Sequence, residues 1–412
     1  MQAASQDRAC SSRRAPRDAP GPTKDRSAVG EKDRQRSRLA IAAIETVPLR
    51  VPLGRTYKGS GYRMTHRSSI VTRITTEDGL VGEAYAGDED AGLEDIDRII
   101  HTEIVPVLVG EDAFAVERCW ELARPATVDI LRDRRLGLVA CACVDTAIWD
   151  LVGKALRQPL WRLWGGYRSR LPMTSIGGYY GAENSIGAEV EELRSRGLAG
   201  MKFKVGGLDP DADAKRFHEA RVAAGPDFVL MADANQGWTP AEAVRFARLV
   251  ADDDLYWFEE PCHWHNDRRA MRDVRLMAGV PVCAGQSEFS AAGCRDLMAD
   301  GAIDFCNFDA SWSGGPTEWR RVAAISLSYD VAMAHHEEPQ VAAHLLAAIP
   351  NGTFLESFHP DRDPIWHHLV ANRPPVADGW LQLGDAPGLG WELDADYLQR
   401  HRVSFDHSPH TS

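Results

Sequence analysis

The fold is decided by a short apolar run that ends in two lysines, Met201-Lys202-Phe203-Lys204-Val205-Gly206. Side chains two residues apart on a β-strand point to the same side, so Lys202 and Lys204 are expected side by side at the strand's carboxyl end. Neighbouring ammonium groups lower each other's pKa, and burial lowers it further, so a lysine here could act as a general base. An exposed edge strand with two solvated lysines would show the same pattern. The rest of the chain must distinguish this reading from a catalytic lysine pair.

Short apolar runs alternate with amphipathic helical patterns from Leu171 onward. Repeated βα units of this number favour a closed parallel barrel over an open sheet, and continuously apolar strands fit a barrel that is buried on both faces. The eight expected strands are Pro172–Tyr179, Met201–Val205, Phe228–Ala234, Tyr256–Glu260, Val280–Gly285, Ile303–Phe308, Val331–His335 and Thr353–Phe358.

The remaining chain divides into three further segments. Residues 1–38 are rich in Arg, Ser and Pro without periodicity, and they are expected to be a disordered extension. Residues 39–160 alternate strand patterns with long helical ones and predict an α+β capping domain. The barrel then occupies 161–360, and residues 361–412 are expected to return to the cap.

Composition limits the partners and the compartment. The 412 residues are 44% hydrophobic and carry a net charge of −13, which argues against nucleic acid and anionic membranes as partners. No unbroken apolar stretch reaches transmembrane length by inspection of the sequence. The eight cysteines form no Cys-x-x-Cys pair, so we expect reduced cysteines and a cytoplasmic protein.

Polar residues stand at the carboxyl ends of seven successive barrel strands, where barrel enzymes keep their chemistry. Three of them, Asp233, Glu259 and Glu288, would bring three carboxylates to the barrel axis, where they repel unless a cation joins them. A set of oxygen ligands favours Mg²⁺, or Mn²⁺, over zinc. The strand ends read Lys202 and Lys204, Asp233-Ala234-Asn235-Gln236, Glu259-Glu260-Pro261, Gly285-Gln286-Ser287-Glu288, Asn307-Phe308-Asp309, His335-His336 and Glu356.

The segment between the first two cap strands has a composition suited to closing over an anionic ligand. Residues 54–63 contain three glycines with Tyr57, Lys58, Tyr62 and Arg63 interleaved, which predicts a mobile, cationic and aromatic loop. An ordinary hairpin connection would have a similar composition.

The combined pattern resembles the enolase superfamily, and within it the mandelate racemase subgroup, over about residues 39–400. Lys-x-Lys, Asp-x-Asn-Gln, Glu-Glu-Pro, Asp, His and Glu follow strands two, three, four, six, seven and eight in order. The stretches 145–154 and 342–348 also resemble the family. The resemblance implies a (β/α)7β-type modified TIM barrel with a cap made of the N-terminal segment and the C-terminal tail. It also implies Mg²⁺, a small carboxylate substrate and a homo-oligomer, often an octamer.

The fifth strand departs from the family pattern. The family usually has a glutamate directly after the strand-five glycine, but this chain has Gln286 there and Glu288 two residues later. Both would face the same side of an extended strand. Glu288 keeps a carboxylate and is the first choice as metal ligand, whereas Gln286 could bind only through its neutral carbonyl.

The resemblance also implies a role for each site residue in removing the proton α to a carboxylate. Lys204 would be the base on one face of the substrate, with Lys202 neutralising the carboxylate. His336 would be the acid or base on the other face, held by Asp309. Glu356 would hydrogen-bond a substrate oxygen, and Asn235 would contact substrate or metal.

Two lysines opposite a His–Asp pair allow two reactions. A substrate with a β-hydroxyl would lose water and give a 2-keto-3-deoxy acid, as in aldonate and aldarate dehydratases, whereas one without it would be racemised. The polar segment at 54–67 suits a polyhydroxy acid and favours the dehydratase. Asp309 occupies the strand-six position where dipeptide epimerases and muconate cycloisomerases have lysine. A decayed binding or structural protein is the remaining alternative.

Overall fold

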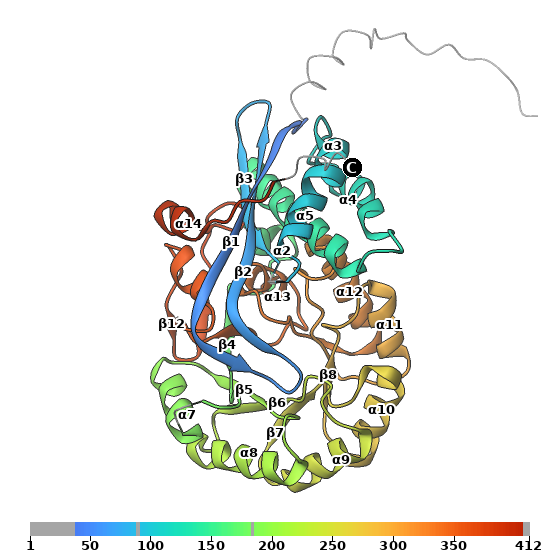
Figure 1. The fold of residues 1–412 in the computed structure, drawn as a ribbon, viewed down its shortest axis with the longest axis vertical. Helices are drawn as coiled ribbons and strands as arrows, with labels where there is room; N and C mark the ends of the chain where they lie inside the picture. The colour runs from blue at the N-terminus through green and yellow to red at the C-terminus, as the bar shows by residue number, and fades with distance from the viewer. Residues whose placement is uncertain (1–37, 88–90, 183–184, 407–412) are drawn as a thin grey trace, which may run out of the picture. The chain divides into compact units, whose positions relative to one another are not determined.

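A computed structural model describes residues 38–87, 91–182 and 185–406 (Figure 1). The expected disordered extension at 1–38 lies outside this range except for Arg38. From Leu39 onward the contacts of the chain form one compact unit, so cap and barrel pack on each other.

Eight parallel strands form the barrel expected from the sequence, and the fold class is confirmed. Neighbours pair in chain order from the first to the seventh strand, and the eighth pairs back onto the first. The strands are β4 (Arg170–Gly177), β5 (Gly200–Lys204), β6 (Val229–Asp233), β7 (Leu255–Glu259), β8 (Val282–Ala284), β9 (Phe305–Cys306), β10 (Ala332–Met333) and β11 (Leu355–Phe358).

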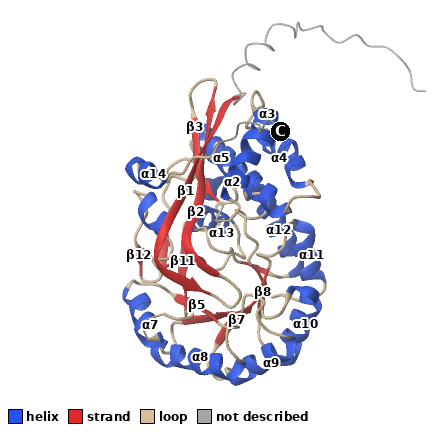
Figure 2. Cartoon of the chain, viewed as in Figure 1, coloured by secondary structure: helices blue, strands red, loops and turns tan. Residues whose placement is uncertain are grey.

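Seven helices connect these strands and cover the outside of the barrel (Figure 2). Their starts are encoded locally: Asp209 and Ser290 cap backbone N–H groups, and Thr239 with Glu242 forms a capping box. The helices are α7 (Ile186–Ser195), α8 (Pro210–Ala224), α9 (Pro240–Leu249), α10 (Asp267–Ala278), α11 (Ala291–Ala299), α12 (Pro316–Ser326) and α13 (Pro339–Ala348), with short 3-10 turns η3 (Trp264–Asn266) and η4 (Leu327–Tyr329).

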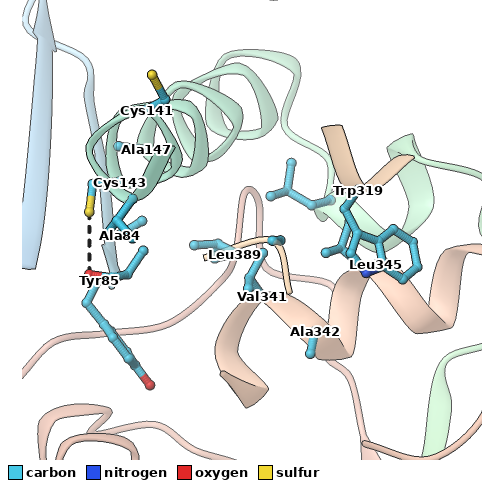
Figure 3. Close-up of a cluster of buried hydrophobic side chains, with 14 of the residues drawn as sticks. Ala84, Tyr85, Cys141, Cys143, Ala147, Trp319, Val341, Ala342, Leu345 and Leu389 are labelled. Atoms are coloured by element: carbon cyan, nitrogen blue, oxygen red, sulfur yellow. Dashed lines mark hydrogen bonds between the residues drawn. The ribbon is translucent and has the colours of Figure 1, made fainter. Parts of the chain in front are cut away.

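The cap combines a three-stranded antiparallel sheet with a group of helices. Figure 3 shows part of the core under it, where α5 side chains such as Cys143 lie near Tyr85 of the third strand. The same cluster of buried residues continues through α12 and α13, so cap and barrel share one core. The elements are β1 (Ile41–Lys58), β2 (Arg63–Thr76), β3 (Val81–Ala86), α2 (Leu93–Ile99), η1 (Ile100–Ile104), α3 (Val105–Leu108), α4 (Val116–Ala123), η2 (Arg124–Thr127), α5 (Arg134–Leu156) and α6 (Leu160–Leu163).

Helix α5 is the one described helix that is long and apolar enough to cross a membrane by length and composition. Inspection of the sequence overlooked it because Asp145 and Asp150 interrupt the apolar run. Of its most apolar window 89% is buried, as in the core helix of a globular fold.

The segment expected to be a loop at 54–63 is instead the end of a long β-hairpin. Strand β1 continues to Lys58 and β2 begins at Arg63, so only residues 59–62 turn. The hairpin extends from the cap to the barrel in Figure 1, and its tip is held there because Ser60 Oγ donates to the Ala234 carbonyl over 2.8 Å. The tip therefore rests on the carboxyl end of β6.

The C-terminal segment contacts both the barrel and the cap, since Leu389 N donates to Asp150 Oδ1 of α5 over 2.8 Å. It contains η5 (Ile365–Leu369) and the hairpin of β12 (Val376–Ala377) and β13 (Trp380–Gln382), and β13 pairs antiparallel with barrel strand β4. After α14 (Ala395–His401), Val403 N donates to the Pro48 carbonyl of β1 over 2.9 Å.

Candidate active site

The two lysines of β5 are buried among the carboxylates of neighbouring strands. Register places Lys204 opposite Asp233 and Asp233 opposite Glu259, so their side chains meet at one level of the barrel. Lys204 Nζ lies 2.6 Å from Asp233 Oδ2 and 3.0 Å from Asn235 Oδ1. Lys202 Nζ lies 2.7 Å from Glu259 Oε1 and 2.6 Å from Glu356 Oε1. The edge-strand alternative for this stretch is therefore wrong.

The pKa values of the two lysines move in the opposite direction from the one expected. Burial lowers the pKa of Lys202, but attraction to Glu259, Glu356 and Asp233 outweighs burial and raises it well above its ordinary value. Burial likewise lowers the pKa of Lys204, and Asp233 more than reverses the effect. Mutual repulsion between the lysines is the weaker influence, because carboxylates surround both of them.

His336 is oriented by Asp309 on the far side of the barrel mouth. His336 Nδ1 donates to Asp309 Oδ2 over 2.9 Å, while the other Asp309 oxygen accepts from Ser311 N and Oγ, both over 2.7 Å. This arrangement leaves His336 Nε2 facing the site, 3.3 Å from Glu337 Oε1. His335 points elsewhere, because its Nε2 accepts from Ala310 N over 3.1 Å.

Two of the three carboxylates expected to hold a metal lie together, and the third does not. Glu259 Oε2 is buried without a hydrogen-bond partner beside Asp233, which fits a cation at that point. Glu288 is half-buried and its carboxylate lies against Gly293 of α11 instead. The chain turns at residues 286–287, where Glu288 N bonds the Gly285 carbonyl over 3.0 Å, so the alternation of an extended strand stops there. Accordingly, the described residues contain no group of three acidic, histidine or cysteine side chains that could hold a metal.

Gln286, unlike Glu288, is buried just after β8. Its side chain is buried, and its Nε2 donates to Glu260 Oε2 over 2.8 Å. Ser287 Oγ and Gln236 Nε2 donate to the other Glu260 oxygen over 2.5 and 3.2 Å. Asp233 and Glu259 are the two carboxylates that the register brings side by side here, while the amide oxygen of Gln286 faces Asn307, whose Nδ2 lies 3.5 Å away.

The residues expected to contact substrate divide into two groups. Tyr62 lies over the site, with its ring centre 5.5 Å from Lys204 Nζ, and Tyr57 is buried. Lys58 and Arg63 are exposed and stand opposite each other on the two strands of the hairpin. Asn235 binds Lys204 and also donates from Nδ2 to Asp233 over 3.1 Å.

Sequence reasoning missed a buried ion cluster beside His336. Arg67 binds Glu337 over 3.1 Å and Glu338 over 2.7 Å, and Arg362 lies 4.0 Å from Glu337. Glu337 and Glu338 both have positive φ angles, of 53° and 46°, a strained backbone that often marks functional sites. The run of four polar residues at 335–338, followed by proline, was the available signal.

Glu337 is ionised in this cluster. Burial raises its pKa, but His336, Arg67, Arg362 and Lys204 together lower it to about 2. With Lys204 3% and His336 4% exposed, the whole site is closed beneath the hairpin.

Comparisons with known proteins match both parts of the chain. Residues 36–165 match the mandelate racemase/muconate lactonizing enzyme N-terminal domain, and residues 185–397 match the enolase C-terminal domain-like family. A 3,6-anhydro-alpha-L-galactonate cycloisomerase from Streptomyces coelicolor is 30% identical, over 88% of this chain and 99% of its own length. An L-talarate/galactarate dehydratase from Salmonella typhimurium is 28% identical, over 85% of this chain and 87% of its own.

A solved structure is more similar. A mandelate racemase/muconate lactonizing enzyme from a marine actinobacterium, in complex with magnesium, is 59% identical with a TM-score of 0.85. The match covers 89% of this chain and 100% of that one.

Proposed function

The chain belongs to the mandelate racemase/muconate lactonizing enzyme family of the enolase superfamily, and on this basis we propose that it is a magnesium-dependent acid-sugar dehydratase. Its substrate would be an aldonic or aldaric acid and its product a 2-keto-3-deoxy acid. Names of relatives such as the L-talarate/galactarate dehydratase support this class of substrate.

The observation that carries the proposal is a pair of proton-transfer groups on nearly opposite sides of the barrel. Lys204 ends β5, and His336 follows β10, three strands away around the barrel in one direction and five in the other. A substrate lying between them would have one group at each face of its α-carbon. Elimination of water needs such a base and acid, placed separately.

In the proposed reaction Lys204 accepts the α-proton in its neutral form, which a cation on Asp233 would favour by weakening the attraction that raises the pKa of Lys204. Lys202 lies beside the substrate carboxylate whose negative charge grows. The electron pair of the broken C–H bond forms a carbon–carbon double bond, and the β-hydroxyl leaves with a proton from His336 Nε2. The products are water and an enol, which tautomerises to the 2-keto acid. Magnesium, when bound, supplies a Lewis acid that stabilises the ene-diolate charge.

Asp233, Glu259 and Gln286 would hold that magnesium, and Mn²⁺ has ligand preferences similar enough to replace it. The orphaned Glu259 Oε2 is the feature of this chain that supports the assignment, and the magnesium complex of the marine relative supports the choice of cation. Asp309 fixes the tautomer of His336, and Glu356 keeps Lys202 charged and in place.

Racemisation of a 2-hydroxy acid is the second candidate, because the same two-sided site could return a proton instead of removing a hydroxyl. Formation of 2-keto acid in Mg²⁺ buffer, measured across aldonic and aldaric acids, tests the first candidate. Exchange of the α-proton in D₂O without 2-keto acid would favour the second. If the protein neither forms 2-keto acid nor exchanges the α-proton with any of these acids, the result would contradict both candidate functions.

We further propose a cytoplasmic homo-oligomer. The seven cysteines in the described part of the chain are free and buried, as in a reducing compartment. Multi-angle light scattering would give the oligomeric state, and a monomer at micromolar concentration would contradict the proposal.

A further inference from the structure

Arg362 is a buried cation whose hydrogen-bonding capacity is only partly used. It follows β11, is 1% exposed, and lies over the ring of Phe358 with a distance of 4.2 Å. Its Nη2 contacts Met64 Sδ at 2.8 Å, while Nε and Nη1 have no partner. Leaving charged donors buried and unpaired is costly, so the arrangement indicates a ligand that completes them.

Tyr179 offers a third unpartnered donor beside Arg362. It follows β4, is 4% exposed, and its hydroxyl has no hydrogen-bond partner. Burial raises the pKa of Tyr179, so the phenol stays protonated and can donate. Its ring packs edge-on against Tyr57 of the hairpin with centroids 5.1 Å apart, which fixes its position.

These donors lie next to the proposed reaction centre. Arg362 Nη2 is 4.0 Å from Glu337 Oε1, and the same oxygen is 3.3 Å from His336 Nε2. Because Arg67 already binds the other Glu337 oxygen over 3.1 Å, Glu337 does not satisfy Arg362. A short carbon chain that begins between Lys204 and His336 can therefore reach Arg362 with its other end.

A cavity of about 340 Å³ opens on the outer side of these residues and is lined by Arg362, Tyr57, Tyr179 and Arg55. Arg55 lies over the Tyr57 ring at 4.4 Å and adds a second guanidinium to the wall. The three acidic residues of the wall are already engaged, and one of them, Asp361, has its Oδ2 3.5 Å from His359 Nδ1. Glu192 Oε1 lies 2.6 Å from His359 Nε2, and Glu189 accepts from Gly178 N over 3.1 Å. The side chains still without partners are donors, so the cavity suits an anion.

We propose that Arg362 and Tyr179 bind the distal carboxylate of a dicarboxylic sugar acid, so that the enzyme prefers aldaric over aldonic acids. The inference rests on the proposed dehydratase function and narrows its substrate class. A carboxylate accepts charge-assisted hydrogen bonds from a guanidinium, whereas the terminal hydroxymethyl group of an aldonic acid is a weaker acceptor.

Steady-state kinetics on acids that differ only at the distal carbon, such as galactarate and galactonate, test the preference. We expect kcat/KM to favour the diacid, and the Tyr179→Phe and Arg362→Lys variants to lower that ratio by about 10- to 100-fold. Tyr179→Phe removes an unpartnered hydroxyl and keeps the ring, so the variant should fold. Arg245→Gln removes a surface guanidinium on α9 and should leave the ratio unchanged.

Binding of the two acids to an inactive variant tests the carboxylate subsite independently of dehydration. In the Lys204→Ala background, calorimetry with Mg²⁺ present should show tighter binding of galactarate than of galactonate, and Tyr179→Phe should abolish the difference. Equal binding of the two acids would overturn the subsite even if dehydration occurs. A diacid preference that Tyr179→Phe removes would support the subsite even if neither acid is dehydrated.

Discussion

The side-chain amide of Gln286 donates to the carboxylate of Glu260 over 2.8 Å. Because the nitrogen is held in this way, the amide oxygen faces the other way, toward Asn307. The hydrogen bond therefore fixes the orientation of the amide at the end of the fifth strand, with its nitrogen on a buried carboxylate and its neutral oxygen toward Asn307.

The first prediction concerns metal affinity. Gln286→Glu should tighten Mg²⁺ binding by about tenfold or more, because it adds a negative oxygen ligand beside Asp233 and Glu259. Gln286→Ala should weaken binding, and Glu288→Gln, whose carboxylate lies by Gly293, serves as the matched control. Isothermal titration calorimetry measures all three. A larger loss from Glu288→Gln than from Gln286→Ala would restore Glu288 as the ligand.

The second prediction concerns the base. Lys204→Ala should slow α-proton exchange in D₂O by about 10²- to 10⁴-fold, since no other described side chain takes its place opposite His336. Removing the ammonium leaves the buried Asp233 carboxylate with less positive charge around it. We therefore expect a lower melting temperature, which added Mg²⁺ should partly restore. Near-normal exchange in the variant would exclude Lys204 as the base.

The third prediction concerns pH. Burial lowers the pKa of His336, but Glu337 and Asp309 reverse this and raise it above the ordinary value of 6.5. Because the proposed acid must be protonated, kcat should fall as pH rises through that raised pKa. Glu337→Gln removes a charge that raises the pKa, so the fall should begin at lower pH in the variant. Lys202 and His335 also lie near His336 and are left unchanged by the substitution.

A pH profile of kcat for both proteins measures this shift. Asp309→Asn tests the tautomer separately, since it should lower kcat at every pH. If kcat of Glu337→Gln falls over the same pH range as kcat of the wild type, a group other than His336 controls that fall.

The fourth prediction concerns the hairpin tip. Ser60→Ala removes the 2.8 Å hydrogen bond to the Ala234 carbonyl, which we expect to be worth about 1 kcal/mol. A less firmly closed tip should raise KM for the acid while the Mg²⁺ affinity stays the same. Thr65→Ala on β2, whose side chain is exposed, is a control for changes in the hairpin itself. A fall in kcat with KM unchanged would argue against a closing role.

Local pattern was sufficient to predict the barrel and the residues at its strand ends. Apolar runs of about five residues fix each strand, and the parallel register then brings Lys204 and Asp233 together without further information. The prediction failed where the chain stops being regular. Glu288 was placed by strand alternation, which the turn at 286–287 interrupts.

Other errors arose because the sequence does not show which distant groups meet. The pKa of Lys202 depends on Glu259 and Glu356, which approach it from two other strands. Arg362 lies in a loop whose sequence gives no signal of the site, and only the closed barrel brings it near Glu337. Three glycines interrupt the strand pattern at 54–63, so the sequence predicts a loop where the structure has a hairpin.

The hairpin that descends from the cap has a consequence for how such an enzyme can diversify. Lys204 and His336 are carried by the barrel, while Tyr57 packs on Tyr179 and Tyr62 lies over Lys204 from the hairpin of a separate sheet. Substitutions in the hairpin can therefore change which acid is accepted without disturbing the reaction itself. A change of substrate would therefore need substitutions in this hairpin first, and the proton-transfer groups proposed on the barrel could stay as they are.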